Sequence, residues 1–407
     1  MTGCKPQPTI QGEDLILKSK SNTTGIEALI KKGVKIANPA TVDIGPEVDV
    51  DRISGEGVAI YTGCRIYGRD TLILPGVKLG YEAPVTVDSC QVGADVELKG
   101  GFFNRAVFLD KVKCGLGSHV REATIMEEQA SIAHTVALKH TILLPFVTLG
   151  SLINFCDCLM AGGTSRRDHS EVGSSYIHFN FTPNQDKATA SLIGDVPRGV
   201  MLNQRPIFLG GQGGLVGPCR LGFGITVAAG TIIRKDEPRS DRLIFGGEGK
   251  GGNVPYNPGN FRMAKKIITN NLSYIANLIA LRHWYQQVRG QFVAPRFPEA
   301  LLEGLDEKVC LAIAERINRL EVVCLRKPES GWSQAKGFLN EQINDPGNVG
   351  VMDPFLESIQ RGISSRGKDY IGVIHGLEPD ASIAGTHWLQ GIVDHIVAEA
   401  SGMMPAL

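Results

Sequence analysis

Aliphatic residues recur at every sixth position along much of this chain. The repeat is clearest in two runs, Ile60-Ile66-Leu72 and Leu215-Leu221-Val227-Ile233. An α-helix repeats every 3.6 residues and an ordinary strand every two, so neither explains a period of six. A parallel β-helix does, because each six-residue unit forms one flat side of a coil and its aliphatic residue points toward the axis. Glycines such as Gly150 and Gly222, which follow these aliphatic residues, let the chain turn the corners.

The spacing of apolar residues changes after the solenoid, so the chain divides into parts. We expect an N-terminal lead-in segment (1–40), a β-helix (41–240), a Gly/Pro linker (241–261) and a helical C-terminal domain (262–407). Apolar residues at steps of three and four predict amphipathic helices from Arg262 to Arg289 and from Pro298 to Leu325, with a further helix at His387–Ala400. We expect this domain to cap the open end of the β-helix or to pack against a neighbouring chain.

The charge balance argues against a nucleic-acid or membrane partner. The 42 Lys and Arg residues cancel the 42 Asp and Glu residues, so any anionic ligand must be held by local basic side chains. We find no apolar run long enough to span a bilayer and no signal peptide. Nine scattered cysteines favour reduced thiols and a cytoplasmic protein. The Cys156-x-Cys158 pair lacks a second pair at zinc-site spacing, so we predict structural cysteines and no metal.

Two polar segments interrupt the six-residue repeat. Ala161–Glu171 reads AGGTSRRDHSE and Phe181–Ser191 reads FTPNQDKATAS. Both are too irregular and too polar for the interior of a coil. Loops that project from a rigid scaffold are where such proteins carry binding and catalytic residues. We therefore expect the functional residues in and beside these two segments.

The order of motifs between Val172 and Ile233 carries a family resemblance. The segment contains VGSSYIHFNF, then a lysine-bearing loop, SLIGD, LVGPCRLG and VAAGT. This succession resembles the left-handed β-helix, hexapeptide-repeat sugar-nucleotide acyltransferases. Within them it is most similar to the C-terminal acetyltransferase half of the bifunctional N-acetylglucosamine-1-phosphate uridyltransferase/glucosamine-1-phosphate acetyltransferase family. The resemblance implies an all-β left-handed solenoid that assembles as a homotrimer, followed here by helices.

The same resemblance implies a reaction and a set of ligand contacts. The reaction is transfer of an acetyl group from acetyl-coenzyme A to a phosphorylated or nucleotide-linked amino sugar. Position by position, the implied coenzyme contacts are Ser174, Asn180, Phe181, Gly211 and Ala229. Lys187 would reach the phosphate of the sugar, with one residue inserted relative to the family spacing. An ammonium group in a loop suits this role because it acts as a point charge.

Two positions depart from the family pattern. The catalytic histidine of the family falls on Ser151, and the asparagine that contacts sugar falls on Glu171. Acyl transfer to an amine needs a base within hydrogen-bond reach, so another histidine must serve. We also find no glycine-rich phosphate loop of a nucleotidyltransferase near the N-terminus. A uridyltransferase or pyrophosphorylase activity is therefore not expected.

His178 and His169 are the histidines that we predict as the base. His178 lies in the hexad beside the expected coenzyme groove; the alternative is an outward-facing residue that stacks between coils. His169 lies in the first projecting segment with Arg166, Arg167 and Glu171, where the two guanidinium groups could clamp a phosphate. The alternative there is a solvated charged loop. Imidazole suits the role because its protonation changes near neutral pH.

Two other functions compete with acyl transfer. A γ-carbonic-anhydrase-like zinc enzyme would use three converging histidines, and His119, His134 and His140 are candidates, although their spacing matches that pattern poorly. A non-catalytic scaffold or regulatory partner of a sugar-nucleotide enzyme is the second alternative, favoured by the serine at the base position. Coenzyme A binding would separate the first function from a scaffold, and stoichiometric zinc would indicate the hydratase.

Overall fold

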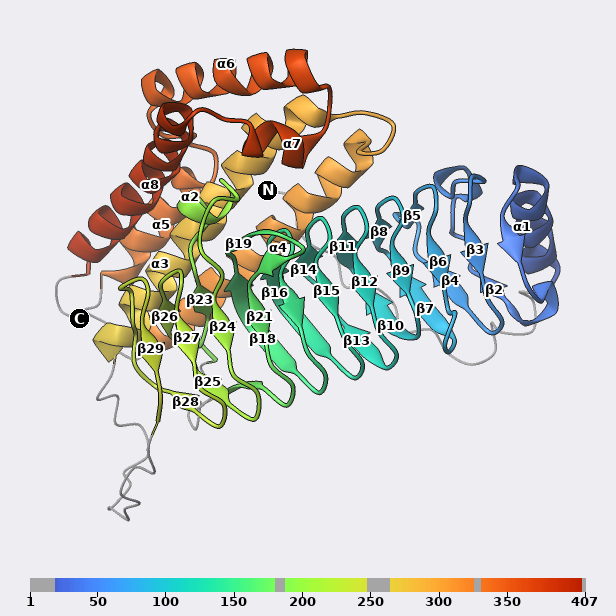
Figure 1. Ribbon diagram of the computed structural model, residues 1–407, viewed down its shortest axis with the longest axis horizontal. Helices are drawn as coiled ribbons and strands as arrows, with labels where there is room; N and C mark the ends of the chain where they lie inside the picture. The colour runs from blue at the N-terminus through green and yellow to red at the C-terminus, as the bar shows by residue number, and fades with distance from the viewer. Residues whose placement is uncertain (1–18, 180–186, 247–263, 326–330, 405–407) are drawn as a thin grey trace.

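The protein is a solenoid with a bundle of helices on one flank (Figure 1), here in a computed structural model. The structure describes residues 19–179, 187–246, 264–325 and 331–404. Within these residues no helix is both long and apolar enough to cross a bilayer. The hexads form the left-handed parallel β-helix that the sequence predicts, preceded by helix α1 (Ser19–Lys32).

The solenoid has three faces of parallel strands. The first face contains β1 (Lys35–Ile36), β3 (Ala59–Ile60), β6 (Lys78–Leu79), β9 (Glu97–Leu98), β12 (Lys113–Cys114), β15 (Ser131–Ile132), β17 (Thr148–Leu149), β21 (Glu171–Val172), β24 (Phe208–Leu209), β27 (Thr226–Val227) and β29 (Leu243–Ile244). The second face contains β2 (Asp43–Ile44), β4 (Arg65–Tyr67), β7 (Val85–Asp88), β10 (Gly101–Asn104), β13 (Ser118–Val120), β22 (Ile177–Phe179), β25 (Gly214–Val216) and β28 (Ile232–Ile233). The third face contains β5 (Leu72–Ile73), β8 (Gln91–Val92), β11 (Ala106–Phe108), β14 (Thr124–Met126), β23 (Ser191–Ile193) and β26 (Arg220–Leu221). Two long strands, β16 (Ala137–Leu143) and β18 (Asn154–Met160), run from the second face onto the third.

On every face, the aliphatic residue of the six-residue repeat is buried inside the solenoid. Residues of the runs that define it, such as Ile66, Leu215 and Val227, are completely buried along the axis. Paired strands of the first face keep one register from coil to coil, with Ile132 opposite Leu149 and Leu149 opposite Val172. Because the register is constant, residues at the same offset stack into columns along the whole solenoid.

The C-terminal part is helical throughout its described residues. It contains α3 (Ala264–His283), a π-helical turn (Trp284–Val288), a 3-10 turn (Arg289–Phe292), α4 (Glu299–Cys324), α5 (Trp332–Gln342), α6 (Val349–Arg366), α7 (Tyr370–His375) and α8 (Pro379–Gly402). The spacing of apolar residues predicted α3 and α4 closely, whereas the last helix begins eight positions before its predicted start at His387, at Pro379. The indole rings of Trp284 and Trp388 are buried at the centre of the bundle.

The helices lie along the third face of their own solenoid, which is neither of the two placements expected from the sequence. Helix α4 contacts β8, β11 and β14, and α3 contacts β23. Gly304 of α4 allows this close approach, because a β-carbon there would lie 2.8 Å from the side-chain oxygen of Gln91 on β8. The third face is therefore covered within one chain.

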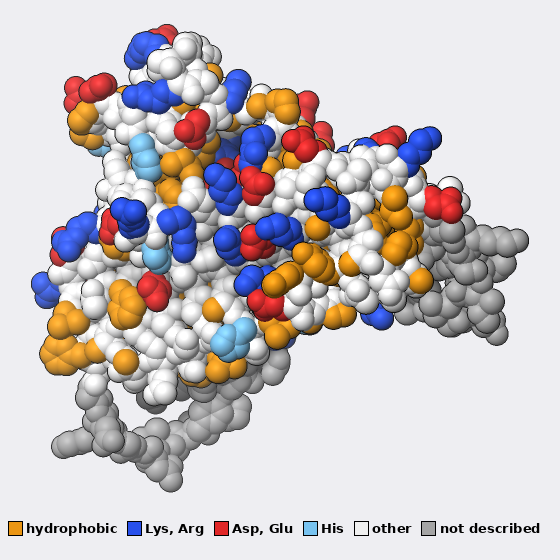
Figure 2. Space-filling view, turned by 45° about the vertical axis from the view of Figure 1, so that its right-hand side comes forward, with side chains coloured by type: hydrophobic (Ala, Val, Ile, Leu, Met, Phe, Trp, Pro, Cys, Tyr) orange, Lys and Arg blue, Asp and Glu red, His pale blue; other side chains and the backbone are white. Residues whose placement is uncertain are grey.

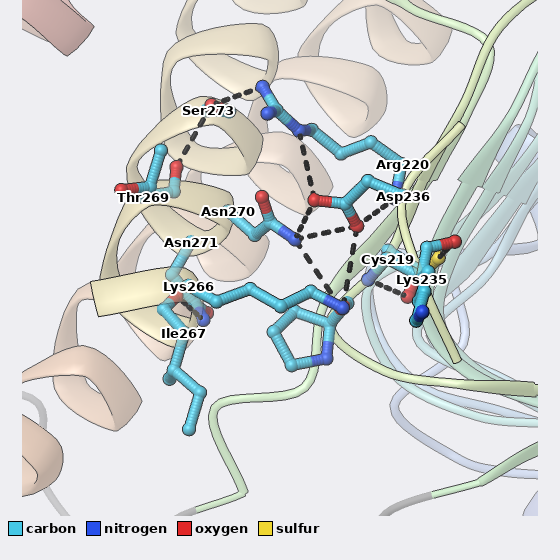
Figure 3. A network of polar contacts seen from close by, with 12 residues as sticks. Cys219, Arg220, Lys235, Asp236, Lys266, Ile267, Thr269, Asn270, Asn271 and Ser273 are labelled. Atoms are coloured by element: carbon cyan, nitrogen blue, oxygen red, sulfur yellow. Dashed lines mark hydrogen bonds and ion pairs between the residues drawn. The ribbon is translucent and has the colours of Figure 1, made fainter. Parts of the chain in front are cut away.

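Charged groups attach the helices to the solenoid as well. Asp236, between β28 and β29, accepts two hydrogen bonds from Asn270 of α3, both at 3.1 Å, and lies 3.6 Å from the ammonium group of Lys266 (Figure 3). Arg220 of β26 completes this network, since its guanidinium donates to the hydroxyl of Ser273 at 3.2 Å. This network links α3 to the solenoid through side chains of both parts.

Candidate functional site

One corner of the solenoid stacks several of the predicted coenzyme contacts. This corner joins the first face to the second, two residues after each buried aliphatic position of the first face. On five successive coils it is formed by His134, Ser151, Ser174, Gly211 and Ala229, which we call the corner column. Ser174, Gly211 and Ala229, distant in sequence, are thus brought together as the resemblance implied.

Backbone hydrogen bonds hold the corner column together. The carbonyl oxygen of each member accepts from an amide on the next coil: His134 from Leu152 at 3.1 Å, Ser151 from Ser175 at 2.8 Å, Ser174 from Gln212 at 2.8 Å and Gly211 from Gly230 at 2.9 Å. The spacing between coils along this edge is therefore fixed. A ligand lying along the column would meet a rigid, preformed surface.

Glycines beside the corner column let successive coils pack closely. A β-carbon on Gly173 would lie 2.4 Å from the amide nitrogen of Gly211, and one on Gly210 would lie 2.4 Å from the amide nitrogen of Ala229. No side chain larger than hydrogen fits at those positions. The result is a narrow strip without bulky side chains, which suits a thin, extended ligand arm such as pantetheine.

Ser151 and His134 form a side-chain hydrogen bond within this column. The hydroxyl oxygen of Ser151 lies 2.8 Å from Nδ1 of His134, one coil below. The amide of Ser151 donates to the hydroxyl oxygen of Ser174 at 3.1 Å. From the sequence we considered His134 only as a possible zinc ligand and did not pair it with Ser151, 17 positions away. Ser151 stands where the family has its catalytic histidine. The equivalent position one coil earlier in the sequence is His134, so the pair could have been found by that comparison.

His178 lies inside the solenoid and not beside an open groove. It is the central residue of β22, whose neighbours Ile177 and Phe179 point outward. Its ring is 5% exposed. Nδ1 lies 2.6 Å from the carbonyl oxygen of Cys156, and Nε2 lies 2.9 Å from the hydroxyl of Ser191. Burial lowers the pKa of His178. The inward placement differs from both sequence expectations, which put the ring beside the groove or on the outside of the coil, and it follows from the alternation of side chains along β22.

The first projecting segment forms a small antiparallel hairpin of β19 (Gly163–Ser165) and β20 (Asp168–His169). Arg166 at its tip turns back onto the solenoid and donates to the carbonyl oxygens of Phe146 at 2.7 Å and Gln129 at 3.0 Å. Burial lowers the pKa of its guanidinium. Arg166 therefore anchors the hairpin, whereas Arg167 is exposed to solvent.

The hairpin and the corner column lie at opposite edges of the first face. His169 precedes β21, and Ser174 follows it. Nε2 of His169 lies 3.9 Å from a carboxylate oxygen of Glu171, which is at the start of that strand. The predicted site residues therefore separate into two groups: the arginines with His169 and Glu171, and the coenzyme contacts.

Lys187 lies at a third place, the corner between the second and third faces. Its side chain is exposed, and its carbonyl oxygen accepts a hydrogen bond from Arg316 of α4 at 3.4 Å. Asn180 and Phe181, the other predicted residues of this loop, lie outside the described residues. Basic and acidic side chains alternate across the boundary between solenoid and helices (Figure 2).

The three histidines considered for zinc have separate environments. His119 stacks on the ring of Phe102 at 5.3 Å, His134 bonds to Ser151, and His140 is buried with Nε2 3.9 Å from Glu122. Within the described residues, no group of three or more His, Cys, Asp or Glu side chains could hold a metal. Cys156 and Cys158 are free thiols on either side of Asp157, and burial raises the pKa of both.

No family model matches the chain. Among curated proteins, it is similar to the bifunctional protein GlmU of Thermotoga petrophila, with 26% identity over 214 residues, which are 52% of this chain and 42% of that protein. GlmU of Fervidobacterium nodosum is 27% identical over 232 residues, 54% of this chain and 43% of the relative. The chain spans less than half the length of these relatives. Together with the solenoid, the matches confirm the resemblance to hexapeptide-repeat acyltransferases of the sugar-nucleotide class that the motifs indicated.

Proposed function

We propose that this protein transfers an acetyl group from acetyl-coenzyme A to an amino group of a phosphorylated or nucleotide-linked sugar. The observation that carries the proposal is the corner column. Ser174, Gly211 and Ala229 are stacked on it at fixed spacing, beside glycines that let the coils pack closely. The similarity to GlmU supports the chemical class of donor and acceptor.

The coenzyme would lie along the corner column with its thioester near Ser151 and Ser174. A pantetheine arm is narrow and carries amide groups, so it can exchange hydrogen bonds with backbone groups of a glycine-rich edge. Lys187 and Arg167 are the exposed basic side chains, among those predicted, that remain available for the sugar phosphate. Arg166 already donates hydrogen bonds to carbonyl oxygens of two coils.

The same edge suits a homotrimer. Apolar side chains are exposed on the second face and along the corner: Phe102, Leu116, Leu152, Ile177, Phe179 and Ile232. Leu152, the most exposed of them at 53%, follows Ser151 directly. Contacts between copies through this surface would cover the apolar side chains and form a groove over the corner column. The free thiols agree with a cytoplasmic location in this proposal.

The test uses a substitution that fills the proposed groove without touching the core. Ala229 and Thr226 are exposed residues of the same coil, one on the corner column and one on the first face. Acetyl-coenzyme A binding is measured by calorimetry, and coenzyme A release is measured with glucosamine 1-phosphate and UDP-linked amino sugars. We expect Ala229→Leu to weaken binding at least tenfold and Thr226→Leu to leave it unchanged.

The non-catalytic alternative makes a different prediction in the same experiment. A scaffold or regulatory partner would bind no acetyl-coenzyme A and release no coenzyme A with any acceptor. If the wild-type protein shows neither, acyl transfer is wrong for this chain. A monomer in sedimentation equilibrium would contradict the homotrimer.

A further inference from the structure

We propose that Ser151 and His134 form a proton relay that deprotonates the acceptor during acyl transfer. This inference rests on the proposed function and adds catalytic residues that the sequence did not predict. The two side chains belong to adjacent coils and are joined by a 2.8 Å hydrogen bond at the corner where the coenzyme would lie.

The backbone around the pair restricts its geometry. The Ser151 amide is bonded to the Ser174 hydroxyl oxygen at 3.1 Å, and the Ser151 carbonyl accepts from Ser175 at 2.8 Å. The carbonyl of His134 accepts from Leu152 at 3.1 Å. Ser151 is half-buried and His134 is exposed. A hydroxyl held between a fixed coil and a solvent-facing imidazole can receive a proton on one side and deliver one on the other.

The other histidines of this region are placed less well for the corner column. His178 is buried with both ring nitrogens bonded. His169 lies beyond β21, at the far edge of the first face. His119 is stacked on Phe102 of the second face. His134 is itself a member of the column, so it needs no movement of the chain to reach a ligand there.

The reaction is balanced without a further reactant. The acceptor nitrogen attacks the thioester carbonyl, and the new C–N bond forms as the C–S bond breaks. The proton of that nitrogen passes to the oxygen of Ser151 while the original hydroxyl proton of Ser151 passes to Nδ1 of His134. The imidazolium then protonates the departing thiolate, which leaves as coenzyme A, and the relay returns to its starting state.

The test compares variants of the pair with matched controls. His134→Gln and Ser151→Ala remove the two groups. His387→Gln, an exposed histidine of α8, and Ser364→Ala, an exposed serine of α6, are the controls. We expect kcat/KM to fall about 10² to 10⁴-fold in the first two, with coenzyme A affinity within threefold of wild type and the controls unchanged.

A double variant separates catalysis from structure. His134→Ala combined with Ser151→His places an imidazole at position 151 itself. This double variant should have a kcat/KM at least tenfold higher than that of His134→Gln or Ser151→Ala. A structural role would not produce this rescue.

Several outcomes would overturn the relay. Turnover of His134→Gln within twofold of wild type would exclude it, and so would loss of coenzyme A binding in that variant. A stable acetyl group on Ser151, found by mass spectrometry after incubation with acetyl-coenzyme A alone, would show that Ser151 is a nucleophile instead. An active wild type with unaffected variants contradicts only the relay, whereas a wild type that neither binds nor turns over contradicts the proposed function.

Discussion

A carboxylate oxygen of Asp157 lies 2.8 Å from the guanidinium group of Arg316, and both side chains are almost completely buried, at 5% and 2% exposure. Asp157 is at the corner where β18 passes from the second face to the third, and Arg316 belongs to α4. The pair therefore joins the solenoid to the helical part at a point that water does not reach. Arg316 also donates to the carbonyl oxygen of Lys187, the residue that the family resemblance assigns to the sugar phosphate.

Removing one partner of this pair should be strongly destabilising. We expect Arg316→Met to lower the free energy of unfolding by about 3–5 kcal/mol, because it leaves a buried carboxylate without its counter-charge. Arg319→Met is the matched control on the same helix: its partner Glu315 lies 2.7 Å away, but this pair is partly exposed, so the loss should be about 0.3–0.5 kcal/mol. Urea unfolding followed by circular dichroism measures both. Equal losses would contradict the role of the buried pair.

The attachment of the helices should weaken as pH rises toward neutrality. Burial, reinforced by the neighbouring Glu128, raises the pKa of Glu127 to about 7, and the hydroxyl of Tyr285 donates to Glu127 at 2.6 Å. At pH values between the ordinary pKa of a glutamate and this raised pKa, Glu127 keeps its proton in the folded state only. Stability from this group is thus present at low pH and is lost as pH rises through about 7, by at most about 1.4 kcal/mol per pH unit.

The variant Glu127→Gln isolates this effect. It keeps an acceptor for Tyr285 but cannot ionise. Urea midpoints at pH 5 and pH 8 should differ less in this variant than in wild type. An identical difference in the two proteins would show that Glu127 does not titrate in this range.

Acid should destabilise the solenoid near His178. Burial lowers the pKa of His178 from its ordinary value of 6.5, so the unfolded chain takes up a proton before the folded protein does. The neutral ring contributes its full stabilisation above pH 6.5, and this stabilisation is lost as the pH falls below that value. His140 and His283 have pKa values lowered in the same direction by burial. His178→Gln should therefore reduce, without abolishing, the fall in melting temperature between pH 7 and pH 5.

A methyl group should be tolerated at one glycine and not at another. Gly173→Ala would place a β-carbon 2.4 Å from the backbone of Gly211, forcing two coils apart at the corner column. We expect a loss of about 1–3 kcal/mol in stability together with weaker acetyl-coenzyme A binding. Gly337→Ala, in α5, meets no atom within 4 Å and should stabilise the protein by about 0.5–1 kcal/mol. Thermal unfolding of the two variants distinguishes these outcomes.

The sequence alone determined the solenoid, because the six-residue spacing of aliphatic residues is a local pattern. Each hexad contributes one buried aliphatic residue and one corner, so the period can be read from any two coils, and residues such as Leu215 and Val227 are buried as expected. The corner column follows from the same regularity. Ser174, Gly211 and Ala229 were assigned as coenzyme contacts by the family resemblance, and they stack at one edge because the register is constant over those coils.

The tertiary structure decided which of the polar candidates face solvent. The alternation of β22 turns His178 inward, where it bonds to neighbouring coils. Arg166 folds back onto carbonyl oxygens that are distant in sequence. The docking of α4 on the third face depends on pairs such as Asp157 with Arg316, whose partners are separated by well over a hundred residues. Such contacts leave no periodic trace in the sequence, because each depends on two surfaces that meet only after folding.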